Sequence, residues 1–155
     1  METMSLALRG QPAPDWADVV VESIPAEAAL LTDPAAWANE IFSAPSLPAP
    51  VMALMGVRQL LAPLVGASRG SWNAFAVREV SGQEALIVQT DRHLDFRASV
   101  GVDPATRLLW VTTAVWFHGW RGHSYFLPVR FLHDPVTRSM MRRAIGRVAR
   151  GTMAA

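Results

Sequence analysis

The chain has 155 residues and a mass of 16.9 kDa, which corresponds to one domain of ordinary size. Hydrophobic residues make up 51 % of the sequence and charged residues 17 %, a composition that excludes intrinsic disorder. The 14 basic residues, all of them arginine, nearly balance the 13 acidic ones, so the net charge of +1 attracts neither nucleic acid nor anionic lipid in general. The absence of cysteine excludes disulfides, thiolate catalysis and cysteine-based metal sites.

The N-terminal residues show no secretory signal, because residues 1–14 contain no apolar run of sufficient length. We therefore expect a cytoplasmic protein that forms a single domain over residues 1–155, with residues 1–14 disordered or loosely packed. Residues 44–67 form a long apolar stretch that carries Arg58 near its middle. An arginine at the centre of a bilayer costs at least ~2.5 kcal/mol. This stretch predicts a buried helix and not a membrane span.

The first half of the chain predicts one strand and two helices. Residues 15–24 are rich in β-branched side chains, as is typical of a strand. Asp33 and Pro34 suit the start of a helix that runs to about Ser43, because Asp33 can accept hydrogen bonds from the free N–H groups of the first turn and Pro34 needs no partner there. The second helix, residues 51–65, has so little polar surface that we expect it to be mostly covered.

The second half of the chain predicts an antiparallel meander and then a long helix. Apolar residues alternate from residue 72 onward, and the strands are expected at residues 72–80, 84–90, 93–102 and 107–118. Beyond Gly119 the pattern is helical, interrupted near Pro128 and restarted at Asp134-Pro135, and it ends near residue 150. The fold class is therefore α+β, with an antiparallel sheet wrapped around the C-terminal helix in a helix-grip-like arrangement.

The third and fourth strands of this meander carry the first candidate site. A four-residue turn at 103–106 would pair Asp95 with Ala114 and Arg97 with Thr112, with one aliphatic face and one mixed face. On the mixed face we expect the catalytic groups to be His93, Asp95 and Arg97. We expect the ligand-binding groups of the same face to be Trp110, Thr112 and Trp116. The alternative is a solvated face on which Asp95 and Arg97 pair loosely and another element or a subunit covers the two tryptophans.

The C-terminal region raises two further questions, about metal and about charge. His118, His123 and His133 are spaced five and ten residues apart, which matches no helical pair of metal ligands, so no metal site is expected. Residues 121–155 contain seven arginines and one aspartate, for a balance of 7 − 1 = +6. This basic region is either a solvated helix face or a surface for phosphate or lipid head groups. No dinucleotide or phosphate-loop motif is present, so no cofactor is expected.

Several of these motifs together resemble a bacterial family catalogued as domain of unknown function 2867. They are the run Asp91-Arg92-His93-Leu94-Asp95-Phe96-Arg97, the strand Val111-Thr112-Thr113 that ends at His118, and the segment from Gly122 through Tyr125-Phe126 and Val129-Arg130 to His133. The similarity extends from residue 33 to residue 143. It implies a relative of the helix-grip group that includes polyketide cyclases and lipid-binding proteins. The family pattern nominates as functional residues His93, Asp95, Arg97, His118, Tyr125 and His133.

The function expected from these features is the binding of a hydrophobic or polycyclic small molecule in a cavity between the sheet and the C-terminal helix. His118, Tyr125 and His133 would contribute to this ligand site. If the domain is an enzyme, acid–base cyclisation or isomerisation without a cofactor is the expected chemistry. The alternative is a non-catalytic module that dimerises through Trp110 and Trp116. A third hypothesis is peripheral attachment of the arginine-rich helix to a membrane, without stable insertion; nucleic acid is not an expected partner.

Overall fold

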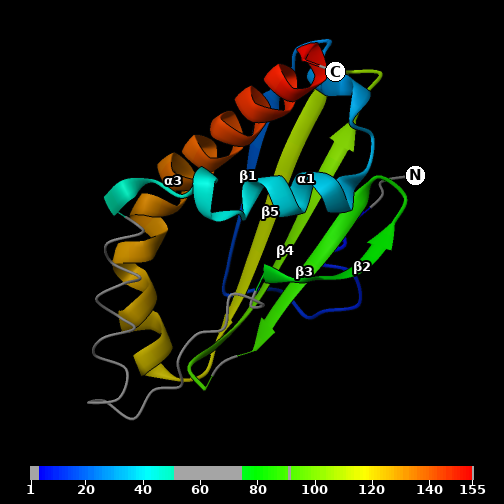
Figure 1. Cartoon of the computed structure of the whole chain (residues 1–155). Helices are drawn as coiled ribbons and strands as arrows, with labels where there is room; N and C mark the ends of the chain where they lie inside the picture. The colour runs from blue at the N-terminus through cyan, green and yellow to red at the C-terminus, as the bar shows by residue number, and fades with distance from the viewer. Residues whose placement is uncertain (1–3, 51–74, 91, 155) are drawn as a thin grey trace.

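The protein forms a five-stranded antiparallel sheet with helices packed on one side (Figure 1). The structure, a computed structural model, describes residues 4–50, 75–90 and 92–154. The predicted helix at 51–65 lies outside these residues. The elements, in chain order, are β1 (Trp16–Ser23), η1 (Ala28–Leu30), α1 (Pro34–Ile41), η2 (Ala44–Ser46), β2 (Val77–Ser81), β3 (Glu84–Thr90), β4 (Leu94–Asp103), β5 (Leu108–Phe117) and α3 (Trp120–Met153). This is the predicted α+β class with its helix-grip-like arrangement.

The sheet has the strand order β1-β5-β4-β3-β2, so β1 and β2 form its two edges. The predicted register of β4 against β5 is wrong by two residues, because Asp95 lies opposite Trp116 and not opposite Ala114. The connecting loop starts one residue later than predicted: the Asp103 carboxylate accepts hydrogen bonds from Ala105 N and Thr106 Oγ1, and Arg107 takes a left-handed φ of 56°. A shift of two residues preserves which face each side chain is on, so the predicted faces are retained.

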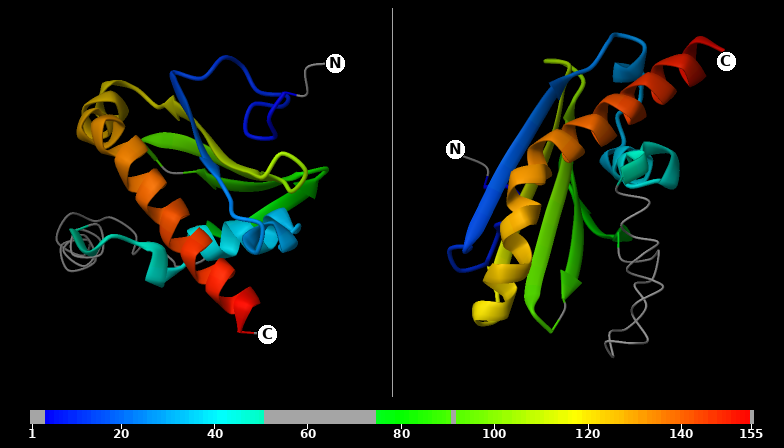
Figure 2. Two further views of the ribbon diagram at one scale, coloured as in Figure 1. Left: turned by 90° about the horizontal axis from the view of Figure 1, so that it is seen from above. Right: turned by 90° about the vertical axis from the view of Figure 1, so that its left-hand side faces the viewer.

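The aliphatic face of the sheet packs against α1 and α3, which cross it on one side (Figure 2). Asp33 caps α1 as predicted, with Oδ1 accepting a hydrogen bond from Ala35 N at 2.9 Å. Trp37 of α1 is fully buried and donates from Nε1 to Leu31 O at 2.7 Å. The core contains mainly small and branched side chains, including Val20, Ile41, Ile87, Ala98, Val100, Leu109, Val111, Met140, Met141 and Ala144.

Helix α3 is continuous, so the predicted interruption near Pro128 is wrong. Both Pro128 and Pro135 lie inside the helix, where each removes one backbone donor, and the axis changes direction between the yellow and orange parts of α3 in Figure 1. The first turn of α3 lies against the start of β4. A Cβ atom at Gly122 would overlap the carbonyl oxygen of His93, so only glycine permits this close approach.

The N-terminal segment packs on the face of the sheet opposite the helices (Figure 2). Leu6 and Ala7 are buried, whereas residues 9–13 are exposed, so the segment packs tightly around the Leu6 and Ala7 side chains. The segment is bound largely through its main chain: Leu6 N donates to Glu84 Oε2 at 2.6 Å, and Leu6 O accepts from Arg97 Nη2 at 3.1 Å. Further along, Pro12 O accepts a hydrogen bond from Trp116 Nε1 at 3.2 Å.

Candidate functional site

The mixed face of β4 and β5 is covered by the chain itself. The Trp110 indole lies across Gly101, where a Cβ atom would overlap it, and donates from Nε1 to Glu84 Oε1 at 2.8 Å. Ser5 Oγ adds contacts to Glu84 Oε2 at 3.1 Å and to the buried Ser99 Oγ at 2.6 Å. Trp110 therefore helps to anchor the N-terminal segment, and this matches the alternative in which another element covers the tryptophans.

Two charged residues of this face each have a buried polar atom with no hydrogen-bond partner within the described part of the chain. Asp95 Oδ2 lies 3.0 Å from His118 Nε2, whereas Asp95 Oδ1 has no hydrogen-bond partner among the described residues. Arg97 donates from Nη2 to the carbonyl of Leu6, whereas its Nε has no hydrogen-bond partner in the ranges that the structure describes. His93 contributes its main chain, because its carbonyl oxygen accepts from His118 N at 2.9 Å. The structure thus joins Asp95 to His118, a pair that was not predicted.

A hollow of about 310 Å³ lies on the other side of the sheet, where β1 begins, β5 ends and α3 starts. We call it the β5–α3 hollow. Its apolar wall is aromatic, because the Trp16 and Phe126 rings meet edge to face with centroids 4.9 Å apart, and the Phe117 and Phe126 centroids are 5.3 Å apart. The lining residues are Asp15, Trp16, Phe117, His123, Ser124, Phe126, Leu127 and Arg130.

The polar residues of the β5–α3 hollow have distinct roles. Asp15 Oδ2 accepts a hydrogen bond from Phe117 N at 2.7 Å and so holds the end of β5. The centroid of the His123 imidazole lies 4.3 Å from that of the Phe117 ring. His123 Nδ1 lies 3.3 Å from Gly119 O. Arg130 adds a cation to the lining. An imidazole and a guanidinium beside aromatic rings are suited to orient a mostly apolar molecule that has one polar group.

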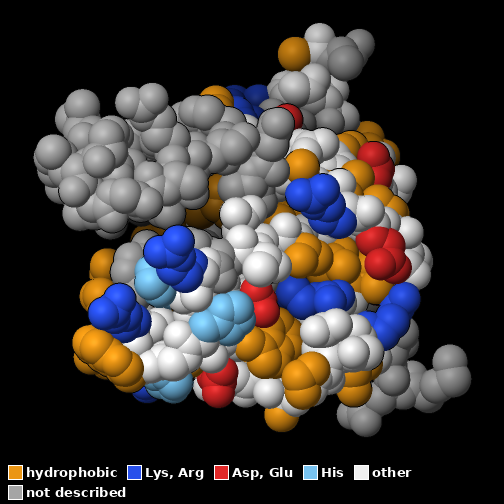
Figure 3. All heavy atoms as spheres, turned by 90° about the horizontal axis from the view of Figure 1, so that it is seen from below, with side chains coloured by type: hydrophobic (Ala, Val, Ile, Leu, Met, Phe, Trp, Pro, Cys, Tyr) orange, Lys and Arg blue, Asp and Glu red, His pale blue; other side chains and the backbone are white. Residues whose placement is uncertain are grey.

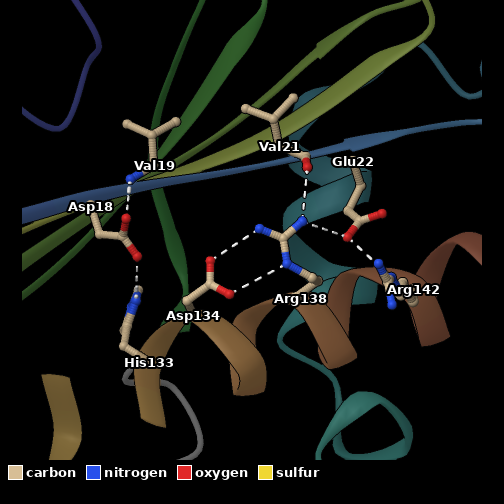
Figure 4. A network of polar contacts seen from close by, with 8 residues as sticks. All are labelled: Asp18, Val19, Val21, Glu22, His133, Asp134, Arg138 and Arg142. Atoms are coloured by element: carbon tan, nitrogen blue, oxygen red, sulfur yellow. Dashed lines mark hydrogen bonds and ion pairs between the residues drawn. The ribbon is translucent and has the colours of Figure 1, made fainter. Parts of the chain in front are cut away.

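His133 lies further along α3, next to the same aromatic cluster. Its Nδ1 is 3.2 Å from Asp18 Oδ2 (Figure 4). Its ring also meets the Trp16 ring edge to face, with the centroids 4.8 Å apart. Burial lowers the pKa of His133 below its ordinary value, and the hydrogen bond to Asp18 only partly opposes this. His133 therefore joins α3 to the edge strand β1 as a neutral side chain.

The same edge of β1 is bonded to an arginine of α3. Arg138 forms an ion pair with Asp134 at 3.0 Å and with Glu22 at 2.9 Å, and it also donates to Val21 O at 3.3 Å (Figure 4). The hydrogen bonds that Arg138 donates to the Asp134 carboxylate lower the pKa of Asp134 and raise the pKa of Arg138. Next to these contacts, Asp18 Oδ1 accepts from Val19 N at 2.8 Å.

The structure therefore divides the predicted site residues into separate places. Asp95, Arg97, Trp110, Thr112 and Trp116 are on the face that carries the N-terminal segment, since each lies an even number of positions from its neighbours along β4 or β5. Tyr125 lies in α3, and nothing of its side chain is described. His123 was considered from the sequence only as a metal ligand, and the other residues of the hollow that were not predicted as site residues include Asp15, Trp16, Phe117, Phe126 and Arg130.

No cluster of three potential metal ligands occurs within residues 4–50, 75–90 and 92–154. In the same part of the chain, no helix combines the length and the apolar character that crossing a bilayer requires.

These features define a one-sheet α+β domain with an aromatic-lined hollow between the sheet and its C-terminal helix. The chain belongs to the family described as protein of unknown function DUF2867, whose sequence model matches residues 12–140. The predicted family resemblance is thus confirmed, and the match begins before the predicted residue 33. Neither the curated proteins nor the solved structures contain a match.

Proposed function

We propose that this domain binds a small, largely hydrophobic or polycyclic molecule in the β5–α3 hollow. The observation that carries the proposal is the hollow itself, in which the rings of Trp16, Phe117 and Phe126 form a continuous aromatic wall. Its volume of about 310 Å³ is at the small end of the range for ligand sites, which favours a compact planar molecule.

The polar groups of the hollow support acid–base chemistry on such a molecule. His123 would exchange a proton with the ligand, because its imidazole carries nitrogens that can donate and accept a proton and lines the hollow. Arg130 would bind a carbonyl oxygen or a carboxylate of the ligand and stabilise negative charge that develops there. A cyclisation or isomerisation needs no more than this transfer of a proton, and no cofactor takes part in the proposal.

The two faces of the sheet can be separated by a matched pair of histidine variants. His123→Ala changes the hollow, whereas His118→Ala changes the opposite face, and both side chains are exposed enough to be replaced without loss of the fold. We would first look for a co-purified molecule by native mass spectrometry. We would then titrate the protein with anilinonaphthalene sulfonate, a planar anionic probe, and follow its fluorescence.

The proposal predicts that His123→Ala weakens probe binding at least about tenfold and that His118→Ala does not. Binding that is lost only in His118→Ala would place the site on the Asp95 side of the sheet and overturn the assignment to the hollow. A protein that binds no probe and sediments as a dimer would favour the alternative interaction module. The N-terminal segment argues against that module, because it already occupies the face around Trp110 and Trp116.

A further inference from the structure

Three large apolar side chains in the first part of α3 are exposed along one side of the helix. Trp120, Leu127 and Phe131 are 73 %, 53 % and 70 % exposed. Their spacing of seven and four residues places them on one side of the helix, and we call them the α3 stripe. Gly122 and Phe126 are buried on the opposite side, against the end of the sheet, so the orientation of the helix is fixed.

Basic side chains lie beside the α3 stripe, and the one acidic residue of α3, Asp134, lies three positions after Phe131 and forms an ion pair with Arg138. Arg121 lies 5.6 Å from the Trp120 ring centroid and Arg130 lies 5.3 Å from that of Phe131, so a guanidinium accompanies each end of the stripe. No residue from 104 to 133 is acidic. Among the acidic groups of neighbouring elements, Asp95 pairs with His118 and Asp15 binds the main chain of β5.

The end of the molecule where α3 begins combines hydrophobic and basic side chains over a wider area (Figure 3). Seen from below, hydrophobic, arginine and histidine side chains gather together on the left side, where α3 begins (Figure 3). A second copy of this chain would need acidic groups to complement these arginines, and this surface of the chain supplies few. An exposed aromatic stripe with arginine on its flanks is the pattern of helices that lie in the plane of a lipid interface.

We propose that the α3 stripe binds peripherally to an anionic lipid surface. The rings of Trp120 and Phe131 would enter the boundary between head groups and acyl chains, and the guanidinium groups of Arg121 and Arg130 would remain at the phosphates. Leu127 belongs both to the α3 stripe and to the lining of the β5–α3 hollow. Binding in this orientation would place the mouth of the hollow next to the lipid.

The inference does not depend on the ligand of the hollow, and it can be tested with lipid alone. The full chain is mixed with vesicles of pure phosphatidylcholine or with roughly one third phosphatidylglycerol, and the bound fraction is measured by flotation. We expect binding to the anionic vesicles, reduced by high salt. The double variant Trp120→Ser/Phe131→Ser should lose at least about tenfold in partition, and so should Arg121→Gln/Arg130→Gln.

The matched control is the double variant Leu30→Ser/Met153→Ser, because both residues are as exposed as the α3 stripe but lie elsewhere. It should bind vesicles like the unchanged protein. Wild-type protein that ignores anionic vesicles, or a control that binds as weakly as Trp120→Ser/Phe131→Ser, would overturn the proposal. The proposal would also be overturned if the protein dimerised without vesicles and Trp120→Ser/Phe131→Ser abolished the dimer. A lower melting temperature in Trp120→Ser/Phe131→Ser but not in the control variant would overturn it too, since either result would show that protein covers the α3 stripe.

Discussion

Asp95 and His118 meet across the ends of β4 and β5, with 3.0 Å between Oδ2 and Nε2. The side chain of Asp95 is 39 % exposed and that of His118 is 43 % exposed, so water screens much of the attraction between them. The other carboxylate oxygen of Asp95 is buried without a partner among the described residues. The geometry is that of an imidazole oriented by a carboxylate, but its contribution to stability should be small.

Replacement of Asp95 by asparagine should therefore lower the free energy of unfolding by no more than about 1 kcal/mol. Urea unfolding of Asp95→Asn, His118→Ala and the double variant would measure the coupling between the two side chains. A coupling well above this value would mean that the pair is much less screened than its exposure indicates.

The close approach of α3 to β4 makes Gly122 sensitive to substitution. In Gly122→Ala the added methyl group would overlap the backbone of His93, and we expect a loss of about 2 kcal/mol in the free energy of unfolding. Gly151→Ala is the control, since no atom lies within 4 Å of the added group and alanine favours a helix. Chemical denaturation should rank Gly151→Ala at or above the wild type, and equal stability of both variants would contradict the packing described here.

The anchoring of the N-terminal segment depends on Glu84, whose carboxylate accepts from Leu6 N, Ser5 Oγ and Trp110 Nε1. Glu84→Gln replaces one acceptor oxygen by a donor, so at least one of these hydrogen bonds is lost, at a cost of about 1–3 kcal/mol. Hydrogen exchange should show faster exchange of the Leu6 amide in this variant. Glu79→Gln, which alters only an exposed ion pair with Arg9, should leave that exchange rate unchanged.

The pKa of His133 predicts a pH dependence of stability. Because burial lowers this pKa in the folded protein, the unfolded chain binds more protons as the pH falls through the ordinary value of about 6.5. Stability should therefore be greater at about pH 7 than at pH 5, and His133→Gln should reduce this slope. Unfolding midpoints of the wild type and of His133→Gln at both pH values would test it, and an unchanged slope in the variant would contradict the prediction.

The sheet could be predicted from the sequence because its signals are local. The bounds of β3 agree with the prediction, and the alternation of apolar residues along β4 and β5 assigns their faces even though the register is off by two. The continuity of α3 could not be predicted, since Pro128 and Pro135 are ordinary stop signals. The packing of β1 and β5 against the helix sets its path, and this information is not local.

The β5–α3 hollow was not predicted from the sequence, for a related reason. Its residues come from segments about a hundred positions apart, such as Trp16 and Phe117, and no local pattern joins them, whereas Asp95 and His118, which were both nominated, meet elsewhere. The N-terminal segment was missed because it binds through main-chain atoms of Leu6 and Pro12, which carry no sequence signal.

The contacts of β1 with α3 have a consequence for the association of this protein with itself. β1 is an edge strand, and an edge with free N–H and C=O groups can pair with a strand of another molecule. Here Val21 O is bonded to Arg138 and Val19 N to Asp18, so two outward-facing groups of that edge are already occupied by side chains. Arg138 and Asp18 thereby hinder the addition of another strand to this edge. They also prevent the exposed valines of β1 from serving as a template for aggregation.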